Sequence, residues 1–358
     1  MVYNYTKRAI IFIGTVCNVR CRFCYYYFTG MKDRRSIWDI KKQMHIVKRT
    51  GMEAIDFSGG EPTMLDELAE LISYARQLGF KTIGMLTNGL KTYKKEYLQK
   101  LVDCGLNNIL FSVHGHNAEE HDYTTQAKGS FSMVIKSIEN VQEIGMPFRI
   151  NCTITKINYK NLEKHAELYN QLKPIQVNFI LFNDFETAFA FADKFLVRYS
   201  DSSSYIKRAI DIMKEKIPYI NVRYIPFCFM KDYEKYVCCY PQKIYDPFEW
   251  SQRLLARLNS KEILPIWKYY AHLGFWFIRY HPPLKINFKE YLEDICITCR
   301  MKTYVKPEKC EGCKFYHICE GLEKSYVDMF DTSELKPANG EKIKDPIVYR
   351  RGFYAGRL

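Results

Sequence analysis

Three cysteines lie close together near the N-terminus, in the pattern Cys17-x3-Cys21-x2-Cys24. They come directly after an apolar run that ends at Gly14, so the pattern predicts a loop that follows a strand. Three thiolates at this spacing provide three ligands for an iron–sulfur cluster. A structural zinc site needs a fourth ligand nearby, and none follows in sequence. The pattern therefore favours a cluster with one iron left open for a substrate or cosubstrate.

A second group of cysteines lies near the C-terminus, in the pattern Cys310-x2-Cys313-x5-Cys319. Two cysteines separated by two residues direct their thiolates into one metal site. The pair Cys296 and Cys299 extends this pattern upstream to Cys-x2-Cys-x10-Cys-x2-Cys, which is close to the spacing of a zinc ribbon. Zinc is therefore the alternative to iron in this half of the chain.

The chain has 358 residues, which predicts about two domains, and its hydrophobic fraction of 47% excludes global disorder. No apolar stretch approaches the ~20 residues that span a bilayer, and the N-terminus shows no secretory signal. We therefore expect a cytoplasmic protein with no membrane partner. Cytoplasmic thiols stay reduced, so clustered members of the 13 cysteines are expected to bind metal rather than to form disulfides.

Six short apolar runs in the first half of the chain predict strands, and five longer amphipathic segments between them predict helices. The strands are predicted at 8–14, 54–58, 82–87, 108–113, 148–154 and 176–181, and the helices at 36–49, 64–79, 94–103, 130–145 and 159–171. This alternation predicts βαβ units around a parallel sheet. An open partial barrel and an open doubly wound sheet both fit six strands. In either fold, the site lies on loops after the carboxyl ends of the strands.

The character of the sequence changes after about residue 215, where Pro, Trp and Tyr become frequent and eight of the cysteines lie between 228 and 319. A strand is predicted over 221–227, and helices over 245–258 and 264–270. The rest of this region suits a segment that is organised by metal rather than by a large core.

The cysteine loop, with Phe23 just before its last cysteine, resembles the signature of the radical S-adenosylmethionine (radical SAM) superfamily. The resemblance covers roughly residues 8–200. The segment Ser58-Gly59-Gly60-Glu61-Pro62 follows the second predicted strand and matches the GGE motif of that family, and Thr87-Asn88-Gly89 follows the third strand. The usual fold of the family is the partial (βα)6 barrel. The resemblance therefore implies an α/β fold of this kind with a smaller Cys-rich C-terminal domain.

The resemblance also implies which residues bind the cofactors. Cys17, Cys21 and Cys24 are expected to hold a [4Fe–4S] cluster whose open iron binds S-adenosylmethionine (SAM). Reductive cleavage of SAM then gives a 5′-deoxyadenosyl radical, which abstracts hydrogen from a substrate. The residues expected to contact SAM are Phe23, Gly59, Gly60, Glu61, Asn88, Ser112 and Asn151. Phe23 is expected near the adenine, and Glu61 is expected to accept a hydrogen bond from the methionyl ammonium.

The C-terminal cysteines resemble the SPASM or Twitch extensions of radical SAM enzymes, which hold auxiliary [4Fe–4S] clusters. A full SPASM pattern continues with a cysteine where this chain has Glu323, so a Twitch-like domain with one auxiliary cluster is expected. Its ligands are expected to be Cys310, Cys313 and Cys319 together with Cys228, which stands where such extensions supply an upstream ligand. Cys296 and Cys299 are the competing choices for that fourth position.

The predicted domains are a radical SAM barrel over 1–215, an auxiliary-cluster domain over 216–330 and a C-terminal tail over 331–358. Three histidines follow the fourth strand, at His114, His116 and His121. They are interpreted either as hydrogen-bond donors or proton carriers for the substrate, or as residues of a surface loop.

The expected function is hydrogen abstraction from a peptide or a small molecule. The formal net charge of +13 raises an alternative, which is the modification of tRNA or another nucleic acid. The same charge suits the docking of an acidic electron donor such as flavodoxin or ferredoxin. A more remote alternative is a zinc-stabilised binding protein without catalysis, and it predicts zinc in place of iron.

Overall fold

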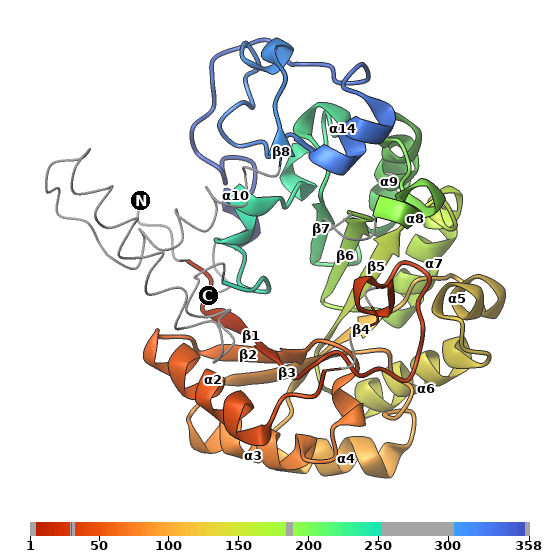
Figure 1. Cartoon of the computed structure of the whole chain (residues 1–358), viewed down its shortest axis with the longest axis vertical. Helices are drawn as coiled ribbons and strands as arrows, with labels where there is room; N and C mark the ends of the chain where they lie inside the picture. The colour runs from red at the N-terminus through yellow and green to blue at the C-terminus, as the bar shows by residue number, and fades with distance from the viewer. Residues whose placement is uncertain (1–4, 29, 31–32, 184–188, 252–303, 355–358) are drawn as a thin grey trace, which may run out of the picture.

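Seven parallel strands form one curled sheet, and their order in space follows their order along the chain (Figure 1). The computed structural model describes residues 5–28, 30, 33–183, 189–251 and 304–354. The strands are β1 (Arg8–Phe12), β2 (Ala54–Ser58), β3 (Thr82–Thr87), β4 (Asn108–Ser112), β5 (Phe148–Ile154), β6 (Gln176–Leu181) and β7 (Tyr219–Arg223). The predicted α/β partial barrel is confirmed, and β7 adds a seventh strand to the six predicted in the first half of the chain.

Helices cover the outer face of this sheet (Figure 1). The longer ones are α2 (Ile37–Arg49), α3 (Leu68–Gln77), α4 (Lys95–Cys104), α6 (Ser130–Glu143), α7 (Leu162–Leu172) and α9 (Tyr199–Met213). The other described helices are short, and they include α1 in the cysteine loop and α10 and α14 beside the C-terminal region: α1 (Tyr25–Phe28), α5 (Ala118–Thr125), α8 (Phe189–Phe195), α10 (Tyr240–Lys243), α14 (Lys324–Phe330) and α15 (Arg351–Tyr354). The five helices predicted in the first half of the chain are all present.

Local sequence signals explain where several helices begin and end. Ser36 begins α2, because its side chain accepts a hydrogen bond of 3.1 Å from the backbone N–H of Asp39. Asn117 begins α5 in the same way, through the N–H of Glu120 at 2.9 Å. Gly105 ends α4 with a φ of 123°, a conformation that glycine adopts readily.

Several described helices were not predicted from the sequence, and α5 and α9 are the longest of them. The buried side chains of α5 are His121, Thr124 and Thr125, so this helix has no apolar stripe to reveal it. The first turns of α9 contain the polar run 200–204, which reads as a loop in sequence. Its buried residues farther along nevertheless follow helical spacing, at Ile206, Ala209, Ile210 and Met213.

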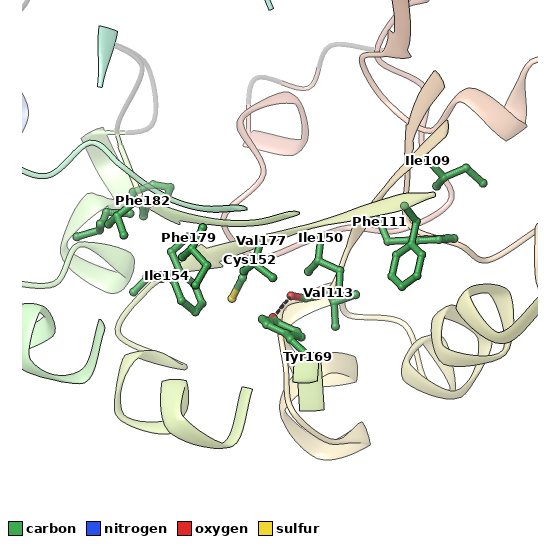
Figure 2. Packing of buried hydrophobic residues seen from close by; sticks show 14 of the residues in the cluster. Ile109, Phe111, Val113, Ile150, Cys152, Ile154, Tyr169, Val177, Phe179 and Phe182 are labelled. Carbon is green, nitrogen blue, oxygen red and sulfur yellow. Dashed lines mark hydrogen bonds between the residues drawn. The ribbon is translucent and has the colours of Figure 1, made fainter. Parts of the chain in front are cut away.

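The main hydrophobic core lies between the sheet and the outer helices. Figure 2 shows part of it, where alternate residues of β4, β5 and β6 face α7. Phe111, Ile150 and Phe179 are fully buried there. The hydroxyl of Tyr169, on α7, donates a hydrogen bond of 2.8 Å to the carbonyl of Val113 (Figure 2). This bond lets a buried tyrosine fill the core without leaving its polar atom unpaired.

The inner face of the barrel is polar near the amino ends of its strands. The fully buried carboxylate of Asp56 accepts hydrogen bonds from Arg8 at 2.9 Å and from Arg149 at 2.9 and 3.0 Å. Trp250 donates a further bond of 2.8 Å to it. Burial raises the pKa of Asp56, but the two guanidinium groups outweigh burial and hold the pKa below its usual value. These contacts fix the segment 246–251 across the open end of the barrel.

The C-terminal region packs beside the last strands of the barrel (Figure 1). It contains a two-stranded antiparallel sheet of β8 (Tyr304–Val305) and β9 (Leu322–Glu323). Tyr326 of α14 stacks on Tyr199 of α9 with ring centroids 4.2 Å apart. Arg350 is buried and donates to Asn221 of β7 at 2.7 Å, so the end of the described chain is joined to the barrel.

Some expectations for this half of the chain differ from the structure. The helix predicted over 245–258 is wrong for its described residues, 245–251, which form turns. There the carboxylate of Asp246 accepts the N–H of Phe248 at 2.9 Å in place of a helical bond. The helix predicted over 264–270 lies outside the described residues. The boundary placed near residue 215 stays a prediction. In the described residues, no helix is long and apolar enough to cross a membrane.

We predict that the variant Arg149→Met is less stable than the wild type by about 3–5 kcal/mol, because it leaves the buried Asp56 without one of its two guanidinium partners. Chemical unfolding at pH 7 measures this loss. The control is Arg208→Met, whose side chain is 47% exposed in a surface pair with Glu163, and we expect its midpoint to match the wild type. Equal midpoints for both variants would contradict the prediction.

Candidate active site and C-terminal cysteine cluster

The three N-terminal cysteines line one cavity of about 700 Å³ at the carboxyl ends of β1 to β4. Cys17, Cys21 and Cys24 lie on the loop that leaves β1, as the sequence predicts. Burial, reinforced by the two neighbouring thiols, raises the pKa of Cys21 well above its usual value. The bare Cys21 thiol is therefore neutral at physiological pH, and a bound metal centre is needed to stabilise its thiolate.

The thiols of the two predicted cysteine sets do not form the most compact groups of candidate ligands. In the described part of the chain, the groups with three ligand atoms within 4.8 Å of one another are His116–Glu120–His165 and Cys238–Asp246–Glu249. Neither predicted cysteine set is among these groups, so each set has at least one pair of sulfur atoms farther apart than 4.8 Å. Thiolates around one tetrahedral zinc ion lie about 3.8 Å apart, because each Zn–S bond is about 2.3 Å long.

Backbone contacts hold the cysteine loop against the loop that follows β2. The N–H of Gly60 donates to the carbonyl of Gly14 at 2.8 Å, and the N–H of Glu61 donates to that of Val16 at 2.9 Å. A Cβ atom on Gly60 would lie 2.1 Å from the Val16 oxygen. Gly59 has a φ of 138° and an equally close neighbour in Gly14. These two glycines are therefore needed for the close approach of the two loops.

The buried carboxylate of Glu61 joins the loops that follow β2 and β3. It accepts hydrogen bonds from the hydroxyl groups of Thr63 and Thr87, both at 2.7 Å, and from the N–H of Asn88 at 2.8 Å. Burial raises the pKa of Glu61, and these donors oppose that rise. Glu61 therefore lines the cavity and also holds two of its loops together.

The polar residues expected to contact SAM lie at successive strand ends. Asn88 lines the cavity and donates to Asn18 at 2.7 Å, with the sulfur of Cys17 at 3.9 Å. Ser112 also lines the cavity, and its register partner on β5 is Asn151. The structure thus brings Phe23, Gly59, Gly60, Glu61, Asn88 and Ser112 into the wall of the cysteine cavity. Asn151 lies buried one strand beyond them.

One histidine of the loop after β4 belongs to this cavity. His114 is buried, lines the cavity and meets the ring of Phe23 edge-on at 4.8 Å. The N–H of Thr153 donates to its Nδ1 at 3.1 Å, so its neutral ring carries the proton on Nε2. Burial lowers the pKa of His114 well below the usual value, which keeps the ring neutral. The surface-loop interpretation is therefore wrong for His114, and also for His121, which is 1% exposed.

The group His116–Glu120–His165 forms a hydrogen-bond network. The oxygen of Asn117 caps α5, so its amide nitrogen donates to Nε2 of His116 at 3.1 Å, which leaves the His116 proton on Nδ1. That Nδ1 and the Nε2 of His165 both contact the same oxygen of Glu120, at 2.9 and 2.7 Å. Burial raises the pKa of Glu120, but these partners lower it to about 2. Sequence reasoning missed this network, because Glu120 and His165 lie 45 residues apart.

Four cysteines meet in the C-terminal region. Cys228, Cys310, Cys313 and Cys319 line one small cavity together with Lys306. Cys228 follows β7 at the end of the barrel, so the cavity joins that end to the C-terminal region. Cys296 and Cys299, the competing ligands, lie outside the described residues.

Backbone N–H groups point at the sulfur atoms of this cysteine set. Gly321 donates to Cys319, and Ala338 donates to Cys313, each at 3.4 Å. Burial raises the pKa of Cys228 to about 12 and that of Cys319 to about 11, although N–H donors to each sulfur oppose the rise. N–H donors of this kind stabilise thiolates and the negative charge of an iron–sulfur cluster.

Comparison with known families identifies the protein family of the barrel. Residues 11–169 match the model of the radical SAM superfamily, and this range contains the end of β1, the cysteine loop, the Gly59–Gly60 loop and β2 to β5. This part of the chain is a radical SAM domain. The cofactors of the superfamily are a [4Fe–4S] cluster and SAM, and the three clustered thiols of this chain fit the cluster.

Several curated proteins are similar to part of the chain. GTP 3′,8-cyclase of Aquifex aeolicus is 30% identical over 146 residues, which are 39% of this chain and 45% of the relative. Fe-coproporphyrin III synthase of Methanosarcina barkeri is 27% identical over 228 residues, or 63% of this chain and 53% of the relative. The chain thus spans about half the length of these relatives.

A solved structure resembles a larger part of the chain. The crystal structure of Streptococcus suis SuiB bound to the precursor peptide SuiA aligns with 95% of this chain and 75% of its own, with a TM-score of 0.55 and 15% identity. At this identity, the likeness shows the fold alone.

We predict that Gly60→Ala loses about four irons per chain after anaerobic reconstitution, since the added Cβ collides with Val16 and displaces the cysteine loop. Iron analysis measures the loss, and circular dichroism checks that the variant is folded. The control is Gly352→Ala, because its added Cβ has no neighbour within 4 Å, and it should keep the iron content of the wild type. A folded Gly60→Ala with full iron content would contradict the prediction.

Proposed function

We propose that this chain is an enzyme that cleaves SAM reductively to a 5′-deoxyadenosyl radical, which abstracts a hydrogen atom from a peptide or a small molecule. The observation that carries the proposal is that the cysteine loop and the Gly59–Glu61 loop form the walls of one cavity. When bound, the cluster supplies the electron for this cleavage and an open iron for the amino and carboxylate groups of SAM. Cys17, Cys21 and Cys24 are its proposed ligands.

The residues around these ligands are proposed to hold SAM. One oxygen of Glu61 accepts a single hydrogen bond, from the N–H of Asn88, so it retains acceptor capacity for the methionyl ammonium. A cation at this position also favours the ionised carboxylate, which opposes the effect of burial. The backbone of Gly59 and Gly60 forms the adjoining wall, and the ring of Phe23 offers an apolar face to the adenine.

Two further polar residues complete the proposed SAM site. Ser112 presents a hydroxyl group to the cavity. Asn151 accepts a hydrogen bond of 2.8 Å from Asn178 through its oxygen, which orients its amide nitrogen as a donor. Both are proposed to bind ribose or carboxylate oxygens of SAM.

We propose that Cys228, Cys310, Cys313 and Cys319 hold one auxiliary [4Fe–4S] cluster. Four cysteine ligands leave no iron open, so this cluster is proposed to accept or pass on an electron rather than to bind the substrate. The backbone donors to Cys313 and Cys319, and the nearby Lys306, favour the more negatively charged reduced state. Zinc bound by the same four thiolates is the alternative that the experiment below separates.

The substrate is proposed only by class. The named relatives act on unlike molecules, since they are a GTP cyclase, a coproporphyrin synthase and, in Methanocaldococcus jannaschii, a pterin dimethyltransferase. The fold relative from Streptococcus suis was solved with a precursor peptide. A small molecule and a peptide therefore both remain within the proposal.

We predict about eight irons per wild-type chain after reconstitution and about four in the triple variant Cys17→Ala, Cys21→Ala and Cys24→Ala. The triple variant should form no 5′-deoxyadenosine from SAM after reduction, because it lacks the cluster that supplies the electron. Iron and zinc analysis and chromatography of the products measure these values.

The matched controls change cysteines outside both sets. Cys104→Ala should keep the iron content and the 5′-deoxyadenosine formation of the wild type, since Cys104 lies on α4. Replacing Cys310, Cys313 and Cys319 should remove about four irons but no zinc. If the wild type holds about four irons and one zinc, the proposed auxiliary cluster is wrong, and the proposed SAM-binding cluster is unaffected. If the wild type has its full iron content but forms no 5′-deoxyadenosine, the proposed enzymatic activity is wrong.

We further propose that the electron donor is an acidic protein such as flavodoxin or ferredoxin, because the chain carries 53 basic and 40 acidic residues. SAM cleavage driven by flavodoxin should slow about tenfold between 50 and 300 mM salt, since screening weakens the docking. Cleavage driven by dithionite is the control and should change little. An equal salt response with both reductants would contradict this prediction, and tight salt-sensitive binding of tRNA would favour the nucleic-acid alternative.

A further inference from the structure

A second, smaller cavity adjoins the cysteine cavity at Phe23, which lines both. It measures about 150 Å³ and lies where β5, β6 and β7 end. The residues that line it are Phe23, Tyr25, Thr153, Ile180, Leu181, Phe182, Asn183 and Tyr224. It is therefore next to the proposed SAM site, on the side of the barrel that meets the C-terminal region.

The size of this cavity fits a single ring. An engineered apolar protein cavity of about 150 Å³ binds one benzene molecule. Its lining contains no acidic or basic side chain among the described residues, so a charged group would lose its hydration there without a partner. The volume and the lining together select a small uncharged group.

Four of the lining side chains are aromatic. The ring of Phe23 is held by His114 at 4.8 Å, and that of Phe182 by Phe195 at 5.6 Å, so these two walls are packed in place. Tyr25 and Tyr224 supply the other two rings. Aromatic rings attract one another in edge-to-face and offset arrangements beyond the effect of buried area. These walls therefore favour an aromatic ring over an aliphatic group of equal size.

The backbone at Tyr224 is unusual. This residue directly follows β7 and has a φ of 62°, in the left-handed region that bulky side chains rarely adopt. Strain of this kind persists where the surrounding structure requires one orientation of the side chain, often at ligand sites. The ammonium group of Lys243 lies 5.4 Å from the centre of the Tyr224 ring and adds a cation–π contact that holds it.

One polar group that lines the cavity has no partner among the described residues. The backbone of Thr153 is paired through both its N–H and its carbonyl, and its hydroxyl makes no bond within the described ranges. The nitrogen of Asn183 donates to the hydroxyl of Tyr304 at 2.8 Å, and the oxygen of Asn183 has almost no accessible surface. A hydroxyl oxygen accepts hydrogen bonds. A ring that carries an N–H or O–H donor would therefore pair with the Thr153 hydroxyl.

We infer that the second cavity is a substrate subsite for one uncharged aromatic ring with a hydrogen-bond donor on its edge, such as a phenol or an indole. The inference rests on the proposed function, because the subsite places this ring beside the radical that SAM cleavage would produce. It narrows the substrate class to molecules with such a ring, either a peptide side chain or a free heteroaromatic compound.

The test measures binding of phenol and of cyclohexanol to the reconstituted full chain with SAM, by equilibrium dialysis. These probes match in size and hydroxyl group and differ in aromaticity. Phenol should bind about tenfold more tightly than cyclohexanol. N-acetyltyrosinamide and guanosine then distinguish a peptide side chain from a nucleoside, according to which of them competes with phenol. Formation of 5′-deoxyadenosine is measured separately, so failure of the subsite and failure of the proposed function give different results.

Variants locate the binding. Tyr25→Leu and Tyr224→Leu each remove one ring from the wall and should weaken phenol binding at least about fivefold. Thr153→Val keeps the shape of the side chain without its hydroxyl and should weaken binding by about two- to fivefold. The control Trp38→Leu removes an aromatic side chain that is 66% exposed, and it should have no effect. Equal binding of phenol and cyclohexanol would overturn the inference, as would phenol binding that both tyrosine variants leave unchanged.

Discussion

The proposed active site depends on the close backbone contact between the loop after β1 and the loop after β2. Two hydrogen bonds, from Gly60 to Gly14 and from Glu61 to Val16, fix the cysteine loop to its neighbour. Only glycine fits at Gly59 and Gly60, because any side chain there would collide with the backbone of the cysteine loop. Glu61 then extends the same attachment to β3 through Thr87 and Asn88. The loops after β1, β2 and β3 are thus joined into one cavity wall. A cluster bound to this wall would keep a fixed position relative to SAM.

Much of the barrel could be predicted from sequence, because each strand of a buried parallel sheet is a short apolar run between turn residues. The cysteine loop was equally visible, since its ligands are neighbours along the chain. Features that depend on distant pairs were not visible. The hydrogen bond from His165 to Glu120 arises only when the sheet curls. The placement of Cys228 beside Cys319 also depends on the fold, and it was expected from the family resemblance rather than from the local sequence. Helix α5 escaped prediction because it buries histidine and threonine where an apolar stripe is expected.

The two cysteine sets suit different tasks because they differ in ligand number and in surroundings. Cys17, Cys21 and Cys24 share a cavity of about 700 Å³ with room for a ligand beside the metal centre. The C-terminal set has four thiols in a much smaller space, with N–H donors aimed at its sulfur atoms. Incomplete ligation in an open cavity favours chemistry at the iron, whereas complete ligation in a closed one favours electron transfer. The proposed division of labour therefore follows from the coordination available at each site.

The radical SAM family match and the second cavity overlap only in part. The radical SAM match ends at residue 169, after β5, so it contains the strands whose ends form the cysteine cavity. β6 and β7, with Asn183 and Tyr224, lie beyond this match and form most of the second cavity. Function is set by sites placed on a fold, so a subsite on these strands could set the substrate without changing the cysteine cavity. The family match and the proposed aromatic subsite are thus contributed largely by different strands of one barrel.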